Sequence, residues 1–204
     1  MGLNIEVAKR LLDIKAVQIR PNDYFTWTSG IKSPIYCDNR LTMSYPEVRN
    51  KIVDAFVEKV ENLDQRPDVI AGCATAGIPH AAWLASRLDL PMTYVRSSAK
   101  GHGKGNQIEG EIKPGQKVVV IEDLISTGGS VLTSVKALVE AGAEVVGVLA
   151  IFTYGLEKAK QQFADAELSF ETITNYDELL QLLESEGKIT SEEKAELENW
   201  RNTL

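Results

Sequence analysis

One stretch near the middle of the chain decides the fold, and it reads Val118-Val119-Val120-Ile121-Glu122-Asp123-Leu124-Ile125-Ser126-Thr127-Gly128-Gly129-Ser130. It opens with four apolar residues in succession, a run typical of a strand buried on both faces of a parallel sheet. Two carboxylates end the predicted strand. A loop of Ser, Thr and Gly then leads into a helix predicted from apolar residues at helical spacing over 131–139. Because ligands of open parallel sheets bind beyond the carboxyl ends of the strands, we expect this loop to line a ligand site.

The loop after the two carboxylates suits a phosphate group. Gly128 and Gly129 let the backbone come close to a ligand. The N–H groups over 126–130 lie at the start of the next helix, where they converge and favour an anion. The hydroxyls in the same range add further donors. The sequence therefore predicts that this loop holds a phosphate.

Glu122 and Asp123 stand beside the predicted phosphate site. Two adjacent carboxylates call for a ligand that donates hydrogen bonds to them, and a ribose 5-phosphate combines a phosphate with a vicinal diol. The alternative is that the acids lie near a helix start by chance, where the helix dipole stabilises negative charge. The coincidence of acids, hydroxyls and glycines within one short stretch favours the ribose phosphate.

Strand and helix patterns alternate along the middle of the chain. Short apolar strands are predicted at 68–72, 92–95 and 145–152, and helices at 46–60 and 78–88. Four or five such alternations predict an α/β fold with a mainly parallel sheet and helices on both faces.

The two ends of the chain differ from this middle part. Ile5, Ala8, Leu12 and Ile19 have roughly helical spacing and predict an opening helix. The segment 25–36 then reads as short strands around a turn.

Two capped helices are predicted near the C-terminus. The first is capped by Asn175 with Glu178, and the second follows a capping-box pattern of Thr190 and Glu193. Its acidic residues are expected to form a solvated face.

Composition and charge exclude several classes of function. The chain has 204 residues and a formal net charge of −7, whereas a protein that binds nucleic acid carries a basic face. Its apolar runs fall far short of the ~20 residues of a membrane helix, and its first residues carry no secretory signal. Cys37 and Cys73 form no metal-ligand pattern and are expected to be reduced thiols. We therefore expect a cytoplasmic protein with neither nucleic-acid nor membrane partners.

A second functional segment reads Arg96-Ser97-Ser98-Ala99-Lys100-Gly101-His102-Gly103-Lys104-Gly105. Its alternating glycines and cations indicate a mobile arm, and a solvated loop without function is the simplest alternative. The Gly-x-Gly-x-Gly pattern does not indicate a dinucleotide fingerprint, because no helix pattern opens behind it. Beside the stretch of Glu122 to Ser130, a solvated loop without function is the weaker explanation of this arm.

These motifs resemble those of a known enzyme family. The stretch from Glu122 to Ser130 is similar to the phosphoribosyl pyrophosphate (PRPP) motif of the type I phosphoribosyltransferases, in the form seen in the orotate phosphoribosyltransferases. The stretch Phe25-Thr26-Trp27-Thr28-Ser29-Gly30-Ile31-Lys32-Ser33-Pro34-Ile35-Tyr36 resembles their N-terminal signature, and 72–77 resembles their pyrophosphate loop. His80 and Trp83, just behind that loop, are expected to be packing residues. The likeness extends over nearly the whole chain.

The resemblance implies a type I phosphoribosyltransferase fold with a small N-terminal hood. It divides the chain into an N-terminal helix and base-binding hood at 1–45, a PRPP-binding α/β core at 46–175, and C-terminal helices packed on the core at 176–204. It also implies that the arm that begins at Arg96 is a lid over PRPP, and that the protein is a homodimer in which each lid reaches into the partner's site.

The resemblance further implies transfer of ribose 5-phosphate from PRPP to orotate, giving orotidine 5′-phosphate and pyrophosphate in de novo pyrimidine biosynthesis. The implied cofactor is Mg²⁺, held mainly by PRPP and water with no direct protein ligand. Lys100, His102 and Asp123 are the implied catalytic residues. Lid closure excludes water, and Lys100 and His102 offset the charge on the departing pyrophosphate. The implied PRPP-binding residues are Arg96, Lys100, His102, Glu122, Asp123, Leu124, Ile125, Ser126, Thr127, Gly128, Gly129 and Ser130.

The sequence departs from the family pattern where the base binds. Thr28 and Ala76 stand where many members carry lysines, and no arginine follows the strand at 145–152. Ser126 is implied to contact orotate. We expect the orotate carboxylate to be held mainly by backbone N–H groups near Thr28, Ser29 and Lys32, because the usual cationic partners are missing.

Two alternative functions are weaker. A purine phosphoribosyltransferase shares the PRPP motif, and the hood signature argues against it. A non-catalytic PRPP-sensing regulator would usually lack the lid and carry a basic nucleic-acid face, which the net charge of −7 does not favour.

Overall fold

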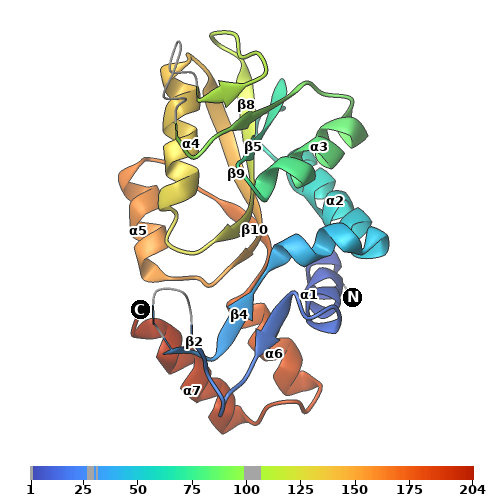
Figure 1. The fold of residues 1–204 in the computed structure, drawn as a ribbon, viewed down its shortest axis with the longest axis vertical. Helices are drawn as coiled ribbons and strands as arrows, with labels where there is room; N and C mark the ends of the chain where they lie inside the picture. Colours follow the sequence, from blue (N-terminus) through green and yellow to red (C-terminus); the bar gives the residue numbers. More distant parts are fainter. Residues whose placement is uncertain (1, 27–29, 31, 99–106) are drawn as a thin grey trace.

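A six-stranded sheet forms the centre of the molecule (Figure 1). The computed structural model describes residues 2–26, 30, 32–98 and 107–204. The strand order is β10-β9-β8-β5-β6-β7, and every neighbouring pair is parallel except β6 and β7. The strands span β5 Val69–Cys73, β6 Met92–Val95, β7 Ile108–Glu109, β8 Lys117–Ile125, β9 Glu144–Thr153 and β10 Glu171–Asn175. The predicted α/β fold with a mainly parallel sheet is therefore confirmed.

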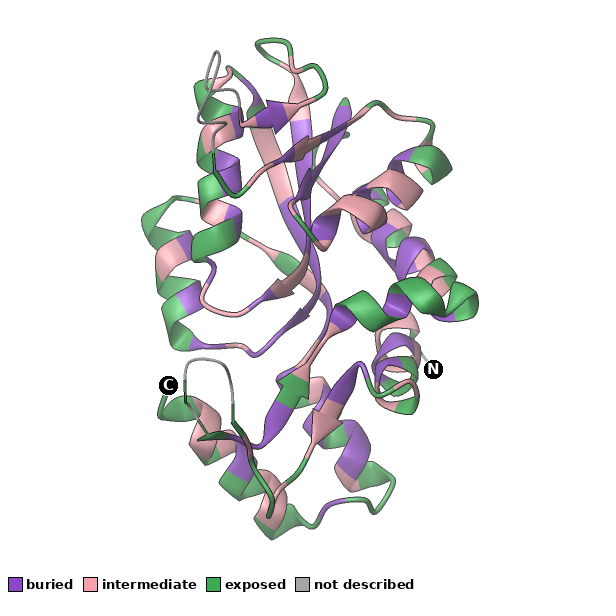
Figure 2. Cartoon of the chain, in the orientation of Figure 1, coloured by how far each residue is buried: buried purple, intermediate pink, exposed green. Residues whose placement is uncertain are grey.

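Helices cover both faces of this sheet. α1 (Leu3–Asp13), α2 (Pro46–Glu61) and α3 (Gly77–Leu88) pack on one face, and α4 (Gly129–Glu140) and α5 (Glu157–Asp165) pack on the other. Figure 2 shows the strands between these layers as mostly buried. In the described part of the chain, each helix is too short or too polar to cross a membrane.

Strand β8 lies in the middle of the fold because its apolar residues face two cores. Val119 and Ile121 belong to the core beneath α2 and α3. Val118 and Val120 belong to the core beneath α4 and α5, and all four side chains are fully buried. Burial of each such side chain stabilises the fold by roughly 1.5–3 kcal/mol. A strand covered on both faces therefore needs the continuous apolar run that the sequence shows.

Strand β8 is longer than the sequence predicts. It continues past Glu122 and Asp123, because β9 still pairs with it at Leu124 and Ile125. The prediction that the two carboxylates end the strand is therefore wrong. Both lie within the hydrogen-bonded strand, which fixes their backbone before the loop begins.

A small hood of short strands lies at one end of the sheet. β1 (Val17–Ile19) pairs with β4 (Ile35–Cys37), and β2 (Phe25–Thr26) pairs with β3 (Lys32–Ser33), both in antiparallel fashion. The predicted short strands around a turn are confirmed for the described residues. A 3₁₀ helix, η1 (Asn39–Ser44), then leads from the hood to α2.

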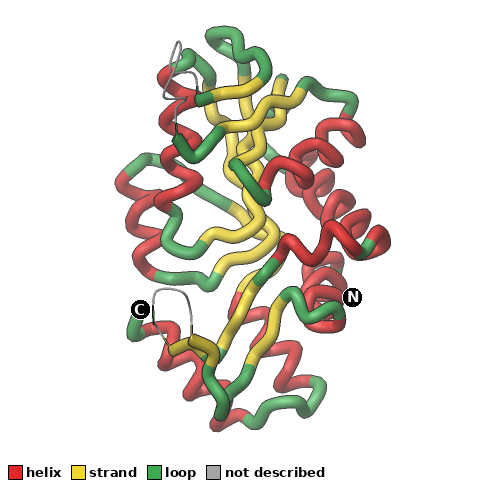
Figure 3. The backbone as a smooth tube through the Cα atoms, in the orientation of Figure 1, coloured by secondary structure: helices red, strands yellow, loops and turns green. Residues whose placement is uncertain are grey.

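The last two helices, α6 (Tyr176–Ser185) and α7 (Ser191–Asn202), lie beside the hood (Figure 3). Leucines of α6 belong to the same core as α1, and the Trp200 Nε1 of α7 donates to the Lys32 carbonyl oxygen at 3.2 Å. The C-terminal helices thus contact both the core and the hood. The division of the chain at 45 and 175 stays a prediction.

Both predicted helix caps are confirmed. The Asn175 side chain accepts from the Glu178 N–H at 3.0 Å. Thr190 accepts from the Glu193 N–H at 3.1 Å, and the Glu193 carboxylate accepts from the Thr190 N–H at 2.9 Å. Each cap stabilises its helix by about 1 kcal/mol.

Two parts of the chain differ from the prediction. Ile19 lies in β1 and not in the opening helix. α1 ends at Asp13, and Lys15 follows in the left-handed conformation at φ 59°, which does not continue a helix. Helix α5 and strand β10 were not predicted. Only Ala159 and Phe163 of α5 are buried, so its sequence carries little apolar periodicity.

Candidate active site

Three loops lie at the same edge of the sheet, because they follow neighbouring parallel strands. They begin after β5, β6 and β8, which are adjacent in the strand order. The carboxyl edge of such a sheet is where ligands bind. The predicted pyrophosphate loop, the start of the predicted lid and the predicted phosphate loop are therefore brought together.

The loop after β8 leaves backbone donors exposed at the start of α4. Gly128 is the N-cap residue and has the left-handed conformation, with φ 91°. A Cβ at Gly128 would lie 3.0 Å from a carbon of the Phe163 ring, so backbone and packing both require glycine. A glycine cap offers no side chain to the first N–H groups of α4. Together with the half-buried hydroxyls of Ser126 and Thr127, these groups form an anion site.

The two predicted carboxylates contact each other at the end of β8. Glu122 is only 7% exposed, and its carboxylate accepts from the Asp123 N–H at 2.9 Å. Burial raises the pKa of Glu122, and its hydrogen bond with the Asp123 carboxyl raises that pKa further. Burial also raises the pKa of Asp123, whereas the bond from Glu122 and the nearby Arg40 lower it. Burial therefore favours the protonated form of both carboxyl groups. Asp123 is half-buried whereas Glu122 is buried, so Asp123 is the carboxyl that a ligand hydroxyl can reach more easily.

Asn39 joins the hood to this acid pair. It is almost fully buried, and its Nδ2 donates to the Asp123 carbonyl oxygen at 2.7 Å. The hydroxyl of Thr42 donates to the Asn39 carbonyl oxygen at 2.6 Å, and this bond stabilises η1. The segment after the hood is thus attached directly to the strand that carries the acids.

A cavity of about 360 Å³ opens between the hood and the ends of β8 and β9. Tyr36 supplies a ring from the hood, and Tyr154 supplies one from the segment after β9. The lining residues are Thr26, Tyr36, Cys37, Arg40, Leu124, Ser126 and Tyr154. Aromatic walls with a few polar groups suit a flat heterocycle.

The loop after β5 packs closely against β8. A Cβ at Gly77 would overlap the carbonyl oxygen of Ile121, so only glycine allows α3 to begin this close to the strand. The Ala74 N–H donates to the Val95 carbonyl at 2.8 Å, and the Ala74–Thr75 peptide is cis. Behind the loop, His80 is buried and contacts the Trp83 ring edge-on, which confirms both as packing residues.

The base of the predicted lid is closed by two hydrogen bonds. The Arg96 N–H donates to the Gln107 carbonyl at 2.9 Å, and the Gln107 side chain donates to the Arg96 carbonyl at 2.7 Å. The Arg96 guanidinium lies 3.5 Å from the Glu109 carboxylate. The predicted residues Lys100 and His102 lie outside the described residues.

Of the predicted base-site residues that the structure describes, Ser126 lies at the cavity and Lys32 does not. Ser126 lines the cavity, as the resemblance implies. Lys32 is exposed, and it does not belong to the cavity lining. Thr28 and Ser29 lie outside the described residues. The prediction that backbone groups near these three positions hold a carboxylate stays a prediction.

Sequence reasoning missed Arg40, Tyr36 and Tyr154 as lining residues. The signal that could have found Arg40 is the polar run Asp38-Asn39-Arg40 directly after a hood strand. Polar residues in succession at the end of a strand seldom serve packing alone.

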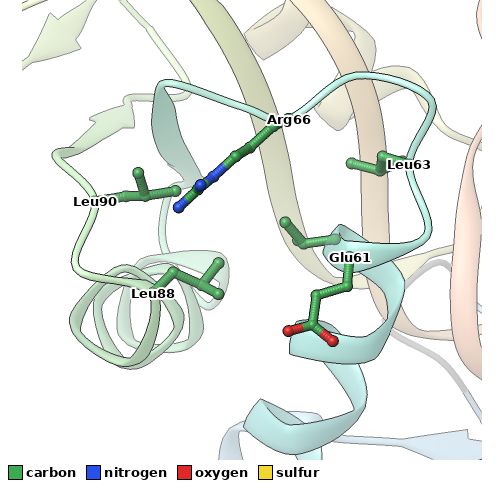
Figure 4. A pocket seen from close by; sticks show the side chains of 6 residues that line it. Glu61, Leu63, Arg66, Leu88 and Leu90 are labelled. Carbon is green, nitrogen blue, oxygen red and sulfur yellow. The ribbon is translucent and has the colours of Figure 1, made fainter.

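A second cavity, of about 350 Å³, lies at the opposite edge of the sheet, near the starts of β5 and β6. Figure 4 shows Leu88 and Leu90 beside the Arg66 side chain, with Leu63 and Glu61 across from them. None of the predicted site residues lies there. The cavity at the carboxyl edge is therefore the candidate active site.

The fold and this edge define a phosphoribosyltransferase. A sequence model of the phosphoribosyl transferase domain matches residues 44–178, which include the loops after β5, β6 and β8. The match spans well over half of the chain.

Known proteins resemble the chain over its full length. An orotate phosphoribosyltransferase of Listeria monocytogenes is 59% identical over 201 residues, which cover 98% of this chain and 96% of that protein. The crystal structure of an orotate phosphoribosyltransferase from Aeropyrum pernix has a TM-score of 0.76 at 32% identity, over 90% of this chain and 99% of its own. The UMP synthase of Leishmania donovani has a TM-score of 0.81 at 29% identity, over 100% of this chain and 43% of its own. The chain belongs to the orotate phosphoribosyltransferase family.

Proposed function

We propose that the protein transfers ribose 5-phosphate from PRPP to orotate, releasing orotidine 5′-phosphate and pyrophosphate in de novo pyrimidine biosynthesis. One observation carries this proposal: the strand with the acid pair and its phosphate loop also lines the aromatic cavity, through Leu124 and Ser126. A phosphate site and a heterocycle site thus share one wall. The name of the Listeria relative supports orotate as the heterocycle.

The reaction needs the two ligands held in line. A ring nitrogen of orotate attacks the anomeric carbon and gives up its proton to pyrophosphate or solvent. The bond from that carbon to pyrophosphate breaks, and its electron pair leaves with pyrophosphate. We assign the 5-phosphate to the N–H groups and hydroxyls over 126–130, and the ribose diol to Glu122 and Asp123. Because orotate supplies the nucleophile, positioning contributes more than a strong base.

The proposed cofactor is Mg²⁺, which offsets negative charge that develops on pyrophosphate. Among the described residues, no group of three or more His, Cys, Asp or Glu side chains is placed to hold a metal ion. In the ranges that the structure describes, Glu122 and Asp123 are the carboxylates that adjoin the phosphate loop, and this pair fits an ion held mainly by PRPP oxygens and water.

The proposed lid residues are Lys100 and His102, acting in the site of a second subunit. Large apolar side chains are exposed on and beside η1, next to the cavity: Leu41, Met43 and Tyr45. Such a patch supports a contact between two copies near the active site. A two-fold dimer would make the exchange of lids reciprocal.

Mixed dimers test the shared lid. Asp123→Asn and Lys100→Ala proteins, each strongly impaired alone, are mixed and allowed to exchange subunits. About half of the dimers should be mixed, each with one intact site, so activity should recover to roughly a quarter of wild type by random pairing. Persistent inactivity, with exchange shown by native mass spectrometry, would mean that each lid serves its own subunit.

One assay separates the candidate reactions. Purified protein, PRPP and Mg²⁺ are mixed with orotate or with a purine base, and the base absorbance is followed. Consumption of orotate alone is expected, and no reaction should occur when Mg²⁺ is left out. Turnover of the purine would favour a purine phosphoribosyltransferase, and PRPP binding without turnover would favour a regulator.

The cytoplasmic location and the lack of nucleic-acid and membrane partners are also proposals. The net charge of −7 supports the lack of nucleic-acid and membrane partners, because nucleic acids and anionic lipids attract basic surfaces. Fractionation of cells that express the tagged protein tests the location.

A further inference from the structure

The base cavity contains a cation that the family motifs do not point to. Of the described residues that line the cavity, Arg40 is the one with a positive charge. It lies on η1, directly after the hood. The other described lining groups are aromatic, aliphatic, thiol or hydroxyl groups, and none of these can neutralise an anion.

Arg40 is held in place by its neighbours along the chain. The Asp38 N–H donates to the Ala16 carbonyl at 2.7 Å, and Asn39 is bonded to the Asp123 carbonyl. The Asp38 side chain accepts from the Arg40 N–H at 3.2 Å and from the guanidinium Nε and Nη2 at 2.6 and 2.9 Å. Backbone and side chain of Arg40 are thus both fixed before any ligand arrives.

This pairing leaves one edge of the guanidinium available. The group has five N–H donors, and Asp38 accepts from two of them. Among the described residues, none accepts a hydrogen bond from the Arg40 Nη1. The side chain is 64% exposed, so a ligand in the cavity can reach it. The edge formed by Nη1 and Nη2 matches the two oxygens of a second carboxylate.

Arg40 keeps its positive charge beside two carboxylates. The hydrogen bond and the charge of Asp38, and to a lesser extent the charge of Asp123, raise the pKa of Arg40, so the guanidinium stays protonated. Asp38 neutralises one edge, and Asp123 is assigned to the ribose diol. Arg40 also lines the cavity whose proposed ligand is a pyrimidine that carries a carboxylate.

We infer that Arg40 binds the carboxylate of orotate and is the residue that makes the enzyme select a carboxylated pyrimidine over uracil. This inference rests on the proposed function and adds a cation to the backbone donors predicted near Thr28, Ser29 and Lys32. It also explains how the site manages without the basic residues that other family members carry.

The test compares Arg40→Gln with wild type on both substrates. The orotate specificity constant should fall about 10- to 150-fold, as expected for loss of a charged hydrogen bond. The KM for PRPP and the slow rate with uracil should stay within about threefold, so the preference for orotate over uracil falls by the same factor. Arg40→Lys should recover part of the loss, because it restores the charge without the second hydrogen bond.

A matched control is Arg87→Gln. Arg87 also pairs with an aspartate, Asp54 at 2.6 Å, but it lies on α3 outside the cavity lining. This variant should keep wild-type constants, and thermal melts should show that both Gln variants are folded.

Three results would overturn the inference. Equal losses with orotate and uracil would indicate a merely structural role. A change confined to the KM for PRPP would indicate that Arg40 binds a phosphate of PRPP. An unchanged specificity constant for orotate would show that Arg40 does not contribute to orotate binding. Wild-type protein without activity on orotate would refute the proposed function instead. In that case, calorimetry would still test whether Arg40 binds orotate. Equal orotate affinities of wild type and Arg40→Gln, or no binding to either protein, would refute the inference.

Discussion

The phosphate half and the base half of the active site are built in different ways. The part of the phosphate half that we assign to the 5-phosphate and the ribose diol comes from one continuous stretch, 122–130, which begins within strand β8. The base half is assembled from residues far apart in the chain, such as Thr26, Arg40, Ser126 and Tyr154. A contiguous half can be recognised from sequence alone, whereas an assembled half becomes visible only in the folded chain.

The largest expected effect concerns the base half. Uracil lacks the carboxylate of orotate, so it would leave polar groups of the site unpaired. A site built to bond a substrate group rejects an analogue without it by about 10⁴-fold. We expect the specificity constant for uracil to be lower than that for orotate by about this factor, measured by base absorbance at saturating PRPP. Comparable constants would show that the base half does not recognise a carboxylate.

The next effect concerns the phosphate half. Asp123→Asn should lower the PRPP specificity constant about 10- to 150-fold, because one charged hydrogen bond to the ribose diol is worth roughly 1.5–3 kcal/mol. The fold should be intact, since the Asp123 backbone keeps its bond from Asn39. Asp54→Asn, on the surface of α2, serves as the control. A PRPP constant within a factor of two of wild type would refute the diol assignment.

A stability change should follow from Gly128→Ala. The residue has φ 91°, and the new Cβ would approach the Phe163 ring, so we expect a loss of about 1–3 kcal/mol in the free energy of unfolding. Gly115→Ala separates the backbone strain from the contact with Phe163. Gly115 also has a positive φ, 82°, but a Cβ added there would have nothing within 4 Å. Denaturant unfolding should show the smaller loss for Gly115→Ala. Equal losses would mean that the contact with Phe163 contributes nothing.

The smallest effect concerns pH. Burial holds the pKa of Glu122 above its ordinary value of 4.5 in the folded protein. The folded state therefore binds the proton more tightly than the unfolded state, so this stabilisation is complete at low pH and is lost as pH rises through the folded pKa. Glu122→Gln should accordingly raise stability relative to wild type by about 1 kcal/mol more at pH 8 than at pH 5. Melting curves without ligand measure the difference, and a gain that is larger at pH 5 would contradict the assignment.

The same contrast explains what the sequence predicts well. Strand β8, its glycine turn and helix α4 were predicted because an apolar run, two acids and two glycines adjoin one another. The parallel sheet and the two helix caps followed from equally local patterns.

The features that the sequence does not predict have weak local patterns or depend on contacts between residues far apart in the chain. Ile19 fits a helical spacing with α1, but it pairs with Ile35 in the hood, a contact that no periodicity reveals. Helix α5 buries only two of its residues, so its pattern is faint. Arg40 and Ser126 line the same cavity although they are far apart in the sequence, so no local pattern predicts that Arg40 belongs to the base site.

The hydrogen bond between Asn39 and the Asp123 carbonyl joins positions 84 residues apart, and it has a consequence for engineering. A chimaera that exchanges residues 1–38 for another hood, in order to accept a different base, would keep this bond and the spacing of the acids. A graft that extends through Arg40 but omits the Asn39 amide would leave the Asp123 carbonyl without this donor. Libraries for altered base choice should therefore vary Tyr36 and Arg40 while holding Asn39 constant.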